Sequence, residues 1–315
     1  PYYEDESTKD EIAFFAKWEK AYSIGSSGSE NLKIYADVQL RQLALNLGAD
    51  QNFLGETPAI PIRNYTFINP KLGISYQVNT KWQFYASFGR SGREPTRFDV
   101  LGATAVNASN IALARDVNSI QAEYVNDVEV GTRWNTESVA LELNLFYMQF
   151  DIPEGFVQVF LNQQASTRQG IELNGNWDLG NTFSQSPNRL NLTGQIGWLQ
   201  AQISSYQPAG SNETLENITP ILSPQVNGQV KFNYKPLKNF SFGIGARYLG
   251  EQFMELTNNE DLVVPSSLVL NLNANWNFYQ KHSLSVQVNN LTNELYYTYG
   301  APDFNGGPAY FVQAP

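Results

Sequence analysis

Apolar and polar residues alternate along most of this chain with a period of two. The stretch 268–278 shows the alternation most clearly. Its odd positions from 271 onward are asparagines, and its even positions are Leu268, Leu270, Leu272, Ala274, Trp276 and Phe278. Successive side chains of a β-strand point to opposite faces of the sheet. The alternation therefore predicts a strand with one apolar face and one amide-rich face.

The same pattern recurs from one end of the chain to the other. In 139–147 the odd positions are apolar, whereas Glu142 and Asn144 are polar. Short apolar–polar runs of this kind predict about twelve strands. They lie at 11–22, 31–46, 66–78, 81–91, 122–134, 138–150, 168–179, 189–204, 222–234, 239–254, 264–278 and 283–297. We therefore predict an all-β fold made of antiparallel strands.

The connections between the predicted strands alternate in length. The short ones lie at 79–81, 135–137, 235–238 and 279–281. The long ones lie at 47–65, 92–121, 151–167, 205–221 and 255–263. The connection 180–188 is longer than a tight turn, although it falls on the short side. Short turns at one end and long loops at the other are typical of transmembrane β-barrels of outer membranes.

The aromatic residues support a membrane barrel. Tyr and Trp favour the interface between lipid and water. Five of the six tryptophans lie near predicted short connections, and a second aromatic set lies roughly ten residues away, about the length of strand that crosses a bilayer. The residues assigned to these interface girdles are Trp18, Tyr76, Trp82, Trp134, Trp177, Trp198, Tyr234 and Trp276. A soluble β-sandwich is the alternative, but it would bury its tryptophans without regard to strand ends.

Composition narrows the choice of function. The chain has 20 basic and 30 acidic residues and a net charge of −10, which argues against nucleic-acid binding. It has no Cys and one His, His282, so we expect no disulfide, thiolate site, His-based metal cluster or catalytic triad. The oxygen-rich run 258–261 would suit Ca²⁺, although most polar loops hold no metal. We therefore expect no enzyme activity, no cofactor and no metal.

Several segments resemble TonB-dependent outer-membrane receptors of Gram-negative bacteria, and they occur in the family's order. The run Val288-Asn-Asn-Leu-Thr-Asn-Glu-Leu-Tyr-Tyr297 is similar to the family's penultimate strand. Other similar segments are Phe67–Tyr76, Tyr85–Pro95, Gly170–Leu173 and Gly307–Pro315. The last of these is similar to the approach to the final strand.

The resemblance implies a barrel of about 22 strands with an N-terminal plug domain inside it. Residues 1–315 would then be a partial barrel. We expect the plug domain and the N-terminal strands to lie outside it, and the final strand to be truncated after Pro315. The strand count agrees, because it places both ends of the chain on the long-loop side, whereas bacterial barrels keep their termini in the periplasm. The implied partners of this monomer are outer-membrane lipid, a small-molecule ligand, and the TonB complex through the plug region.

Four charged residues cluster where a predicted strand enters a long loop. Two interpretations of them are open. They could contact an anionic ligand such as a ferric chelate, or they could be ordinary rim charges that are paired or solvated, which is the more common case. These candidate ligand-binding residues are Arg90, Arg93, Glu94 and Arg97.

A second set of charged residues is expected on the polar face, toward the barrel lumen. In this family such groups hold the plug more often than they contact substrate along a pathway. The set comprises Asp127, Glu129, Arg133, Glu142, Glu172, Lys231 and Arg247.

The resemblance implies a bacterial outer-membrane receptor that takes up a scarce ligand with energy supplied by TonB. Siderophore-bound iron is the first candidate ligand, followed by cobalamin or an oligosaccharide. A passive porin-like channel and a secreted all-β binding protein are the alternatives.

Overall fold

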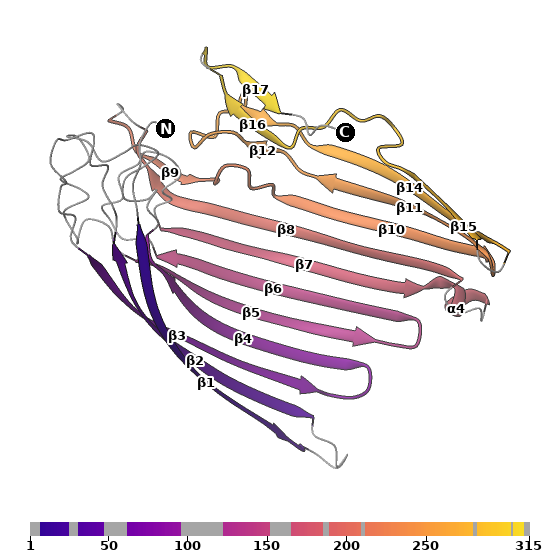
Figure 1. Ribbon diagram of the computed structural model, residues 1–315, viewed down its shortest axis with the longest axis horizontal. Coiled ribbons are helices and arrows are strands. Elements are labelled where there is room, and N and C mark those ends of the chain that lie inside the picture. The colour runs from indigo at the N-terminus through magenta and orange to yellow at the C-terminus, as the bar shows by residue number, and fades with distance from the viewer. Residues whose placement is uncertain are drawn as a thin grey trace.

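The structure is a computed structural model that describes residues 7–24, 31–46, 62–95, 122–151, 165–184, 189–208, 212–279, 282–303 and 305–311. Its main feature is one antiparallel sheet in which twelve strands form a continuous path in chain order (Figure 1). They are β1 (Thr8–Tyr22), β2 (Leu32–Asn46), β3 (Arg63–Gln77), β4 (Trp82–Arg93), β5 (Glu123–Asn135), β6 (Val139–Asp151), β7 (Ser166–Asp178), β8 (Leu190–Tyr206), β10 (Val226–Leu237), β11 (Phe240–Leu249), β14 (Ser267–Phe278) and β15 (His282–Val288). The prediction of an all-β fold with about twelve antiparallel strands is confirmed.

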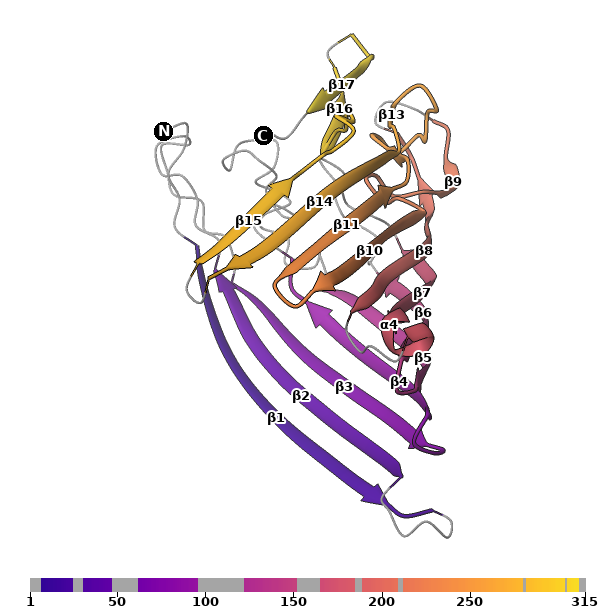
Figure 2. The same ribbon diagram turned by 90° about the vertical axis from the view of Figure 1, so that its right-hand side faces the viewer.

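The sheet is a curved, open wall. Figures 1 and 2 show its strands fanning round from β1 to β15. Within the described ranges no strand pairing joins β1 to β15, so these two strands are the edges of the path. No helix in the described part of the chain is long and apolar enough to cross a membrane.

The strand register places the apolar residues of neighbouring strands in rows on one face. Leu143 pairs with Leu173, and Leu173 pairs with Ile196. These three side chains keep 37%, 40% and 53% of their surface exposed. Soluble proteins rarely expose a continuous apolar surface of this kind. We call this side of the sheet the outward face and the opposite, polar side the inner face.

The two ends of the strands differ. At one end, β3–β4, β5–β6 and β10–β11 are joined by very short connections; we call this the turn end. A six-residue helix, α4 (Leu179–Ser184), lies there between β7 and β8 (Figure 1). Asp178 accepts a hydrogen bond from the Asn181 backbone N–H at 2.9 Å and so caps this helix. The helix explains why 180–188 is longer than the other short connections.

The opposite end, which we call the loop end, carries short strands that the alternation did not predict. They are β9 (Leu215–Ile218), the pair β12 (Gln252–Phe253) and β13 (Val263–Val264), and the pair β16 (Tyr299–Pro302) and β17 (Pro308–Phe311). β9 pairs with the end of β8. We call these five strands and the described residues between them and the main sheet the loop-end cap.

The loop-end cap has a small core of its own. Met254, Leu262 and Val264 are buried, and Leu222 and Tyr297 pack against them. A β-carbon on Gly300 would lie 2.8 Å from Val264, so β16 packs closely on this cluster. Three connections that are far apart in the sequence therefore form one packed unit.

Asparagine also links these connections. The Asn258 side chain accepts a hydrogen bond from Thr219 N–H at 2.6 Å and donates one to the Thr219 carbonyl at 2.9 Å. Asn258 has φ 55°, a left-handed conformation that asparagine adopts more readily than most residues. This residue belongs to the oxygen-rich run considered for Ca²⁺, and its side chain is occupied by the backbone of a neighbouring segment.

Two predicted strands were wrong in extent. The strand predicted at 283–297 ends at Val288, because Asn290 and Asn293 both have φ 52° and turn the chain out of the extended conformation. The strand predicted at 239–254 ends at Leu249, where the chain leaves for the loop-end cap. Residues 308–311, interpreted as the approach to a descending strand, form β17 and pair with β16.

On the inner face, aromatic rings lie over glycines of the neighbouring strand. Tyr35 covers Gly73, Tyr85 covers Gly131, and Phe146 covers Gly170. The Tyr85 hydroxyl donates to Glu142 or Asn144 on β6, both at 3.2 Å. Each ring thus fills the space above a residue that has no side chain and ties adjacent strands together.

We predict that Gly131→Ala lowers the free energy of unfolding by about 1–3 kcal/mol. The new β-carbon would lie 2.7 Å from the Leu143 carbonyl oxygen and would collide with the Tyr85 ring. Urea unfolding of the lipid-reconstituted protein would measure the change. Gly245→Ala is the matched control, because its β-carbon would lie 3.8 Å from its nearest neighbour, the Val230 carbonyl oxygen. Equal stability of the two variants would contradict the packing described.

Candidate functional site

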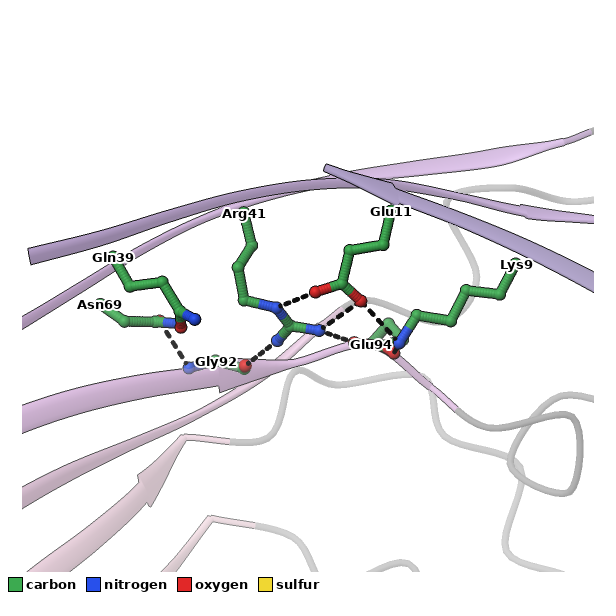
Figure 3. A network of polar contacts seen from close by, with 7 residues as sticks. All are labelled: Lys9, Glu11, Gln39, Arg41, Asn69, Gly92 and Glu94. Carbon is green, nitrogen blue, oxygen red and sulfur yellow. Dashed lines mark hydrogen bonds and ion pairs between the residues drawn. The ribbon is translucent and has the colours of Figure 1, made fainter. Parts of the chain in front are cut away.

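A polar network joins four strands at the loop end on the inner face (Figure 3). Lys9 and Glu11 come from β1, Gln39 and Arg41 from β2, Asn69 from β3, and Gly92 and Glu94 from the end of β4 and the residues after it. We call these seven residues the loop-entry network. It forms where the chain leaves the sheet for the connection that follows β4.

Arg41 lies at the centre of the loop-entry network. Its guanidinium donates to Glu11 at 2.8 and 3.1 Å, to Glu94 at 3.4 Å and to the Gly92 carbonyl at 3.3 Å. The side chain is 16% exposed and lies over the Phe67 ring, 5.3 Å from its centroid. Two carboxylates and a carbonyl thus share one cation, in the forked geometry that guanidinium favours.

The Asn69 side chain takes the place of part of the backbone hydrogen bonding between β3 and β4. β3 and β4 pair only as far as Lys71 and Gly89, although β4 continues to pair with β5 up to Arg93. Beyond that point the Asn69 side chain accepts a hydrogen bond from Gly92 N–H at 2.9 Å and donates one to Gln39 at 3.2 Å. A β-carbon on Gly92 would lie 2.8 Å from the Tyr124 ring and against Phe67. Beyond Gly89, β4 therefore no longer pairs with the backbone of β3. Its end instead packs closely against the Phe67 ring of β3.

Glu94 fixes the first residues beyond β4. It pairs with Lys9 and with Arg41, and its side chain is 16% exposed. Burial alone would raise the pKa of Glu94, but the Lys9 hydrogen bond and the charge of Arg41 outweigh it, so this pKa lies below its usual range. Glu94 is therefore ionised at neutral pH and holds the start of the connection against β1 and β2.

A large cavity lies against the inner face of β5–β15. Its volume is about 1330 Å³. Asn, Gln, Thr and Gly supply most of its lining, together with the charged residues Arg133, Glu142, Lys231, Arg247 and Glu294. Arg133 pairs with Glu142 at 3.0 Å. The wall of this cavity is therefore rich in amides and carries little net charge.

The ion pairs of the sheet are concentrated on its first strands. Every ion pair found between described residues involves only β1–β6 and Glu94. The inner face thus carries its ion pairs on β1–β6 and mostly amides on its later strands, beside Glu172, Lys231 and Arg247. The strand register produces this separation of ion pairs from amides, because it brings residues more than a hundred positions apart in the sequence onto one face.

The four rim candidates have different surroundings. Arg93 pairs with Glu123, and Glu94 belongs to the loop-entry network. Arg90 lies over the Tyr124 ring, 4.4 Å from its centroid. Arg97 lies outside the described residues. The geometry matches the interpretation as paired rim charge for Arg93 and Glu94, and ligand contact by any of the four stays a prediction.

The second charged set lies on the inner face. Arg133, Glu142, Lys231 and Arg247 line the cavity. The remaining three, Asp127, Glu129 and Glu172, share the face that opposes the apolar rows. One carboxylate oxygen of Asp127 is buried and has no hydrogen-bond partner among the described residues. A role in holding a plug or lining a path stays a prediction.

The aromatic candidates lie on the outward face. Seven of the eight are close to the turn end, and Trp82 pairs with Trp134, with ring centroids 6.0 Å apart. Trp198 lies further along β8 toward the loop end. The turn-end members are Trp18, Tyr76, Trp82, Trp134, Trp177, Tyr234 and Trp276.

Glu94 is the only member of the loop-entry network that sequence analysis named as a candidate site residue. Lys9, Glu11, Arg41 and Asn69 are ordinary polar positions of alternating strands, and only the register brings them together. The usable signal was local: Asn69 precedes a proline in a predicted strand, and Gly92 directly follows the predicted strand 81–91. These positions mark the place where the ladder changes.

Comparison with known families gives the classification. The family described as "TonB dependent receptor-like, beta-barrel" matches residues 3–291. This chain belongs to the TonB-dependent receptors. The family consists of outer-membrane transport receptors rather than enzymes, so the resemblance seen in the sequence is confirmed.

Individual TonB-dependent receptors are similar at low identity. The siderophore receptor PiuA of Acinetobacter baumannii is 22% identical over 260 residues, which are 79% of this chain and 34% of PiuA. The ferric yersiniabactin uptake receptor FyuA of Yersinia pestis has a TM-score of 0.70 at 16% identity, over 98% of this chain and 44% of FyuA. The ferric citrate transporter FecA gives 0.70 at 19% identity, again over 98% and 44%. The chain spans less than half of the length of each of these relatives.

We predict that Arg41→Met destabilises the receptor by about 1–3 kcal/mol, because it removes charge-assisted hydrogen bonds and leaves two carboxylates with Lys9 alone. Urea unfolding in lipid would measure the loss. Lys17→Met is the control, since Lys17 pairs with Glu19 at 3.3 Å but is 59% exposed. Its effect should be about 0.5 kcal/mol or less. A similar loss in both variants would show that the loop-entry network adds nothing beyond surface pairing.

The pH dependence of the Arg41→Met effect is a second readout. Glu94 has a lowered pKa in the folded receptor, so its contribution is present above its ordinary value of 4.5 and is lost as the pH falls through the folded value. The difference between wild type and variant should be constant above about pH 5 and shrink at lower pH. A difference that grows on acidification would contradict this assignment.

Proposed function

We propose that this chain forms part of the wall and outer loops of an outer-membrane receptor that imports a scarce small molecule with energy supplied through TonB. The observation that carries the proposal is the division of the sheet, in a chain of this family, into an apolar outward face and a polar inner face that borders a large cavity. Transmembrane barrels have this alternation, with lipid outside and a polar interior. We place the turn end in the periplasm and the loop end outside the cell.

A complete receptor would contain more than these residues. The chain covers 34–44% of the three relatives compared above. We propose that the plug domain, the N-terminal strands and the rest of the last strand lie outside residues 1–315, in a barrel of about 22 strands. The amide-rich cavity wall and the Asp127 carboxylate would then face the plug or the transport path.

Siderophore-bound iron is the first candidate ligand. The names of PiuA, FyuA and FecA refer to siderophores or ferric complexes. Cobalamin and oligosaccharides are the other candidates. Fold alone does not choose among them, because ligand preference depends on the side chains of the site.

The charge at the loop end bears on this choice. The segments 205–225, 250–266 and 289–311 contain no Lys or Arg, whereas acidic residues such as Glu216, Glu251 and Glu260 are exposed there. Of the nearby described cations, Arg41 and Arg93 are already paired and Arg90 lies over the Tyr124 ring. A surface field of this sign repels strongly anionic complexes. We therefore expect a neutral ferric complex, such as a trihydroxamate, to be taken up better than an anionic one.

Uptake measurements test the proposed function. We predict that the complete receptor, expressed in a host without its own siderophore receptors, restores growth on iron-limited medium with a ferric trihydroxamate more than with ferric citrate. Disrupting the host tonB gene should abolish this growth. Growth that is independent of TonB would instead support the passive channel, because diffusion through a pore needs no energy source.

The membrane placement has a separate test. We predict that Leu173→Arg lowers stability in lipid by about 2–4 kcal/mol, because Leu173 lies in the middle rows of the outward face. Asn174 is one residue away, on the inner face, and lines the cavity, so Asn174→Arg should lower stability much less. Unfolding titrations in vesicles would compare the two. Equal losses would show that the two faces are not divided between lipid and water.

A further inference from the structure

The turn end of the sheet carries an excess of positive charge. We considered the described residues that lie in turn-end connections or within three residues of a turn-end strand boundary. The basic ones are Lys20, Lys33, Lys81, Arg133, Arg189, Lys235 and Lys238. The acidic ones are Glu19, Glu137, Glu142 and Asp178. This excess contrasts with the net charge of −10 for the whole chain.

Most of these acidic groups are already engaged. Glu19 pairs with Lys33 at 3.1 Å, Glu142 pairs with Arg133, and Asp178 caps α4. Five exposed cations therefore take part in no ion pair among the described residues: Lys20, Lys81, Arg189, Lys235 and Lys238. They are spread along the turn end from β1 to the β10–β11 connection. We call these five residues the basic rim.

Exposed apolar side chains lie at the same level. Phe183 on α4 is 73% exposed and its ring centroid is 6.0 Å from that of Trp177, which lies on the outward face. Tyr279, after β14, is 88% exposed. Figure 1 shows α4 at the end of the sheet where the short connections lie. The basic rim and these exposed rings therefore lie at the same end of the sheet.

This arrangement fits the surface of a lipid leaflet. Aromatic rings favour the boundary of the hydrocarbon, and Lys and Arg next to it reach the phosphate layer. The loop end suits such contact less well, because its segments 205–225, 250–266 and 289–311 contain no basic residue, and its cations Lys9 and Arg93 are paired with Glu94 and Glu123. Charge thus distinguishes the two ends of the strands, and the turn end is the better complement to an anionic surface.

We propose that the basic rim binds the headgroup phosphates of anionic phospholipids in the leaflet at the turn end, and that Phe183 and Tyr279 insert beside them. The proposal rests on the membrane placement given above and goes beyond the uptake function. It assigns a lipid preference to one end of the receptor, independent of the transported ligand. A cation beside an anionic leaflet changes binding by about five-fold, so several together give a clear preference.

Brominated lipids provide the test, because bromine quenches tryptophan fluorescence on contact. The complete receptor would be reconstituted with brominated phosphatidylglycerol or brominated phosphatidylcholine. We expect stronger relative binding of phosphatidylglycerol, and a fall of at least about five-fold in this preference in the variant K20Q/K81Q/K238Q. The three side chains are exposed, and none makes a hydrogen bond or ion pair with another described residue, so the variant should fold.

The matched control carries the same change in net charge at the other end. It combines Asn212→Asp, Thr214→Glu and Ser266→Glu, which replace exposed residues of the loop-end cap. This variant should keep the preference for phosphatidylglycerol, and millimolar inorganic phosphate should leave it unchanged in the wild type. A preference that survives in K20Q/K81Q/K238Q, or that falls equally in the control, overturns the proposal. Displacement by inorganic phosphate would also overturn it, since it would indicate a site for free anions.

Failure of the lipid preference is distinguishable from failure of the proposed function. If neither brominated lipid quenches the receptor, the outward face is not in contact with lipid and both proposals fail. If both lipids quench it equally, the receptor is inserted and only the lipid preference is lost.

Discussion

The continuous antiparallel hydrogen-bond ladder is the constraint on which the rest of the structure depends. Once twelve strands pair in order, every side chain in them is assigned to one of two faces, and each residue between the two edge strands acquires fixed neighbours on both sides. The apolar rows, the aromatic rings over glycine, and the charge pairs of the inner face all follow from this register. Lys9, Glu11 and Arg41 meet because β1 and β2 pair in one particular way, not because they are close in sequence.

Two features that distinguish this sheet from a regular one lie where the hydrogen-bond ladder is interrupted. β4 leaves β3 beyond Gly89, and the Asn69 side chain takes over as the acceptor for Gly92. β15 ends where asparagines adopt left-handed conformations. Both interruptions occur at the loop end, where binding residues of this architecture are free to vary on a rigid scaffold. Departure from regular pairing and capacity for recognition therefore coincide.

The sequence pattern was sufficient to predict the strands that pair regularly in the sheet. Alternation at 268–278 and 139–147 gave strands, faces and order, because a half-buried strand has a period that few other structures share. It failed at 289–297, where the alternation is no longer strict and two asparagines adopt positive φ and turn the backbone. It also missed α4 and the loop-end cap, whose short elements are held by contacts such as Asn258 with Thr219. Partners of that kind are set by three-dimensional packing, which a single sequence does not encode in its periodicity.

The contrast between the turn end and the loop end also has an evolutionary consequence. Adding one residue inside a strand such as β6 would move each later side chain of that strand to the opposite face, unless a bulge absorbed it. Adding residues to a loop-end connection leaves every strand register intact and costs little closure entropy. Insertions and deletions among homologous receptors should therefore accumulate at the loop end, so that this surface can diverge quickly while the strands of the wall keep their length.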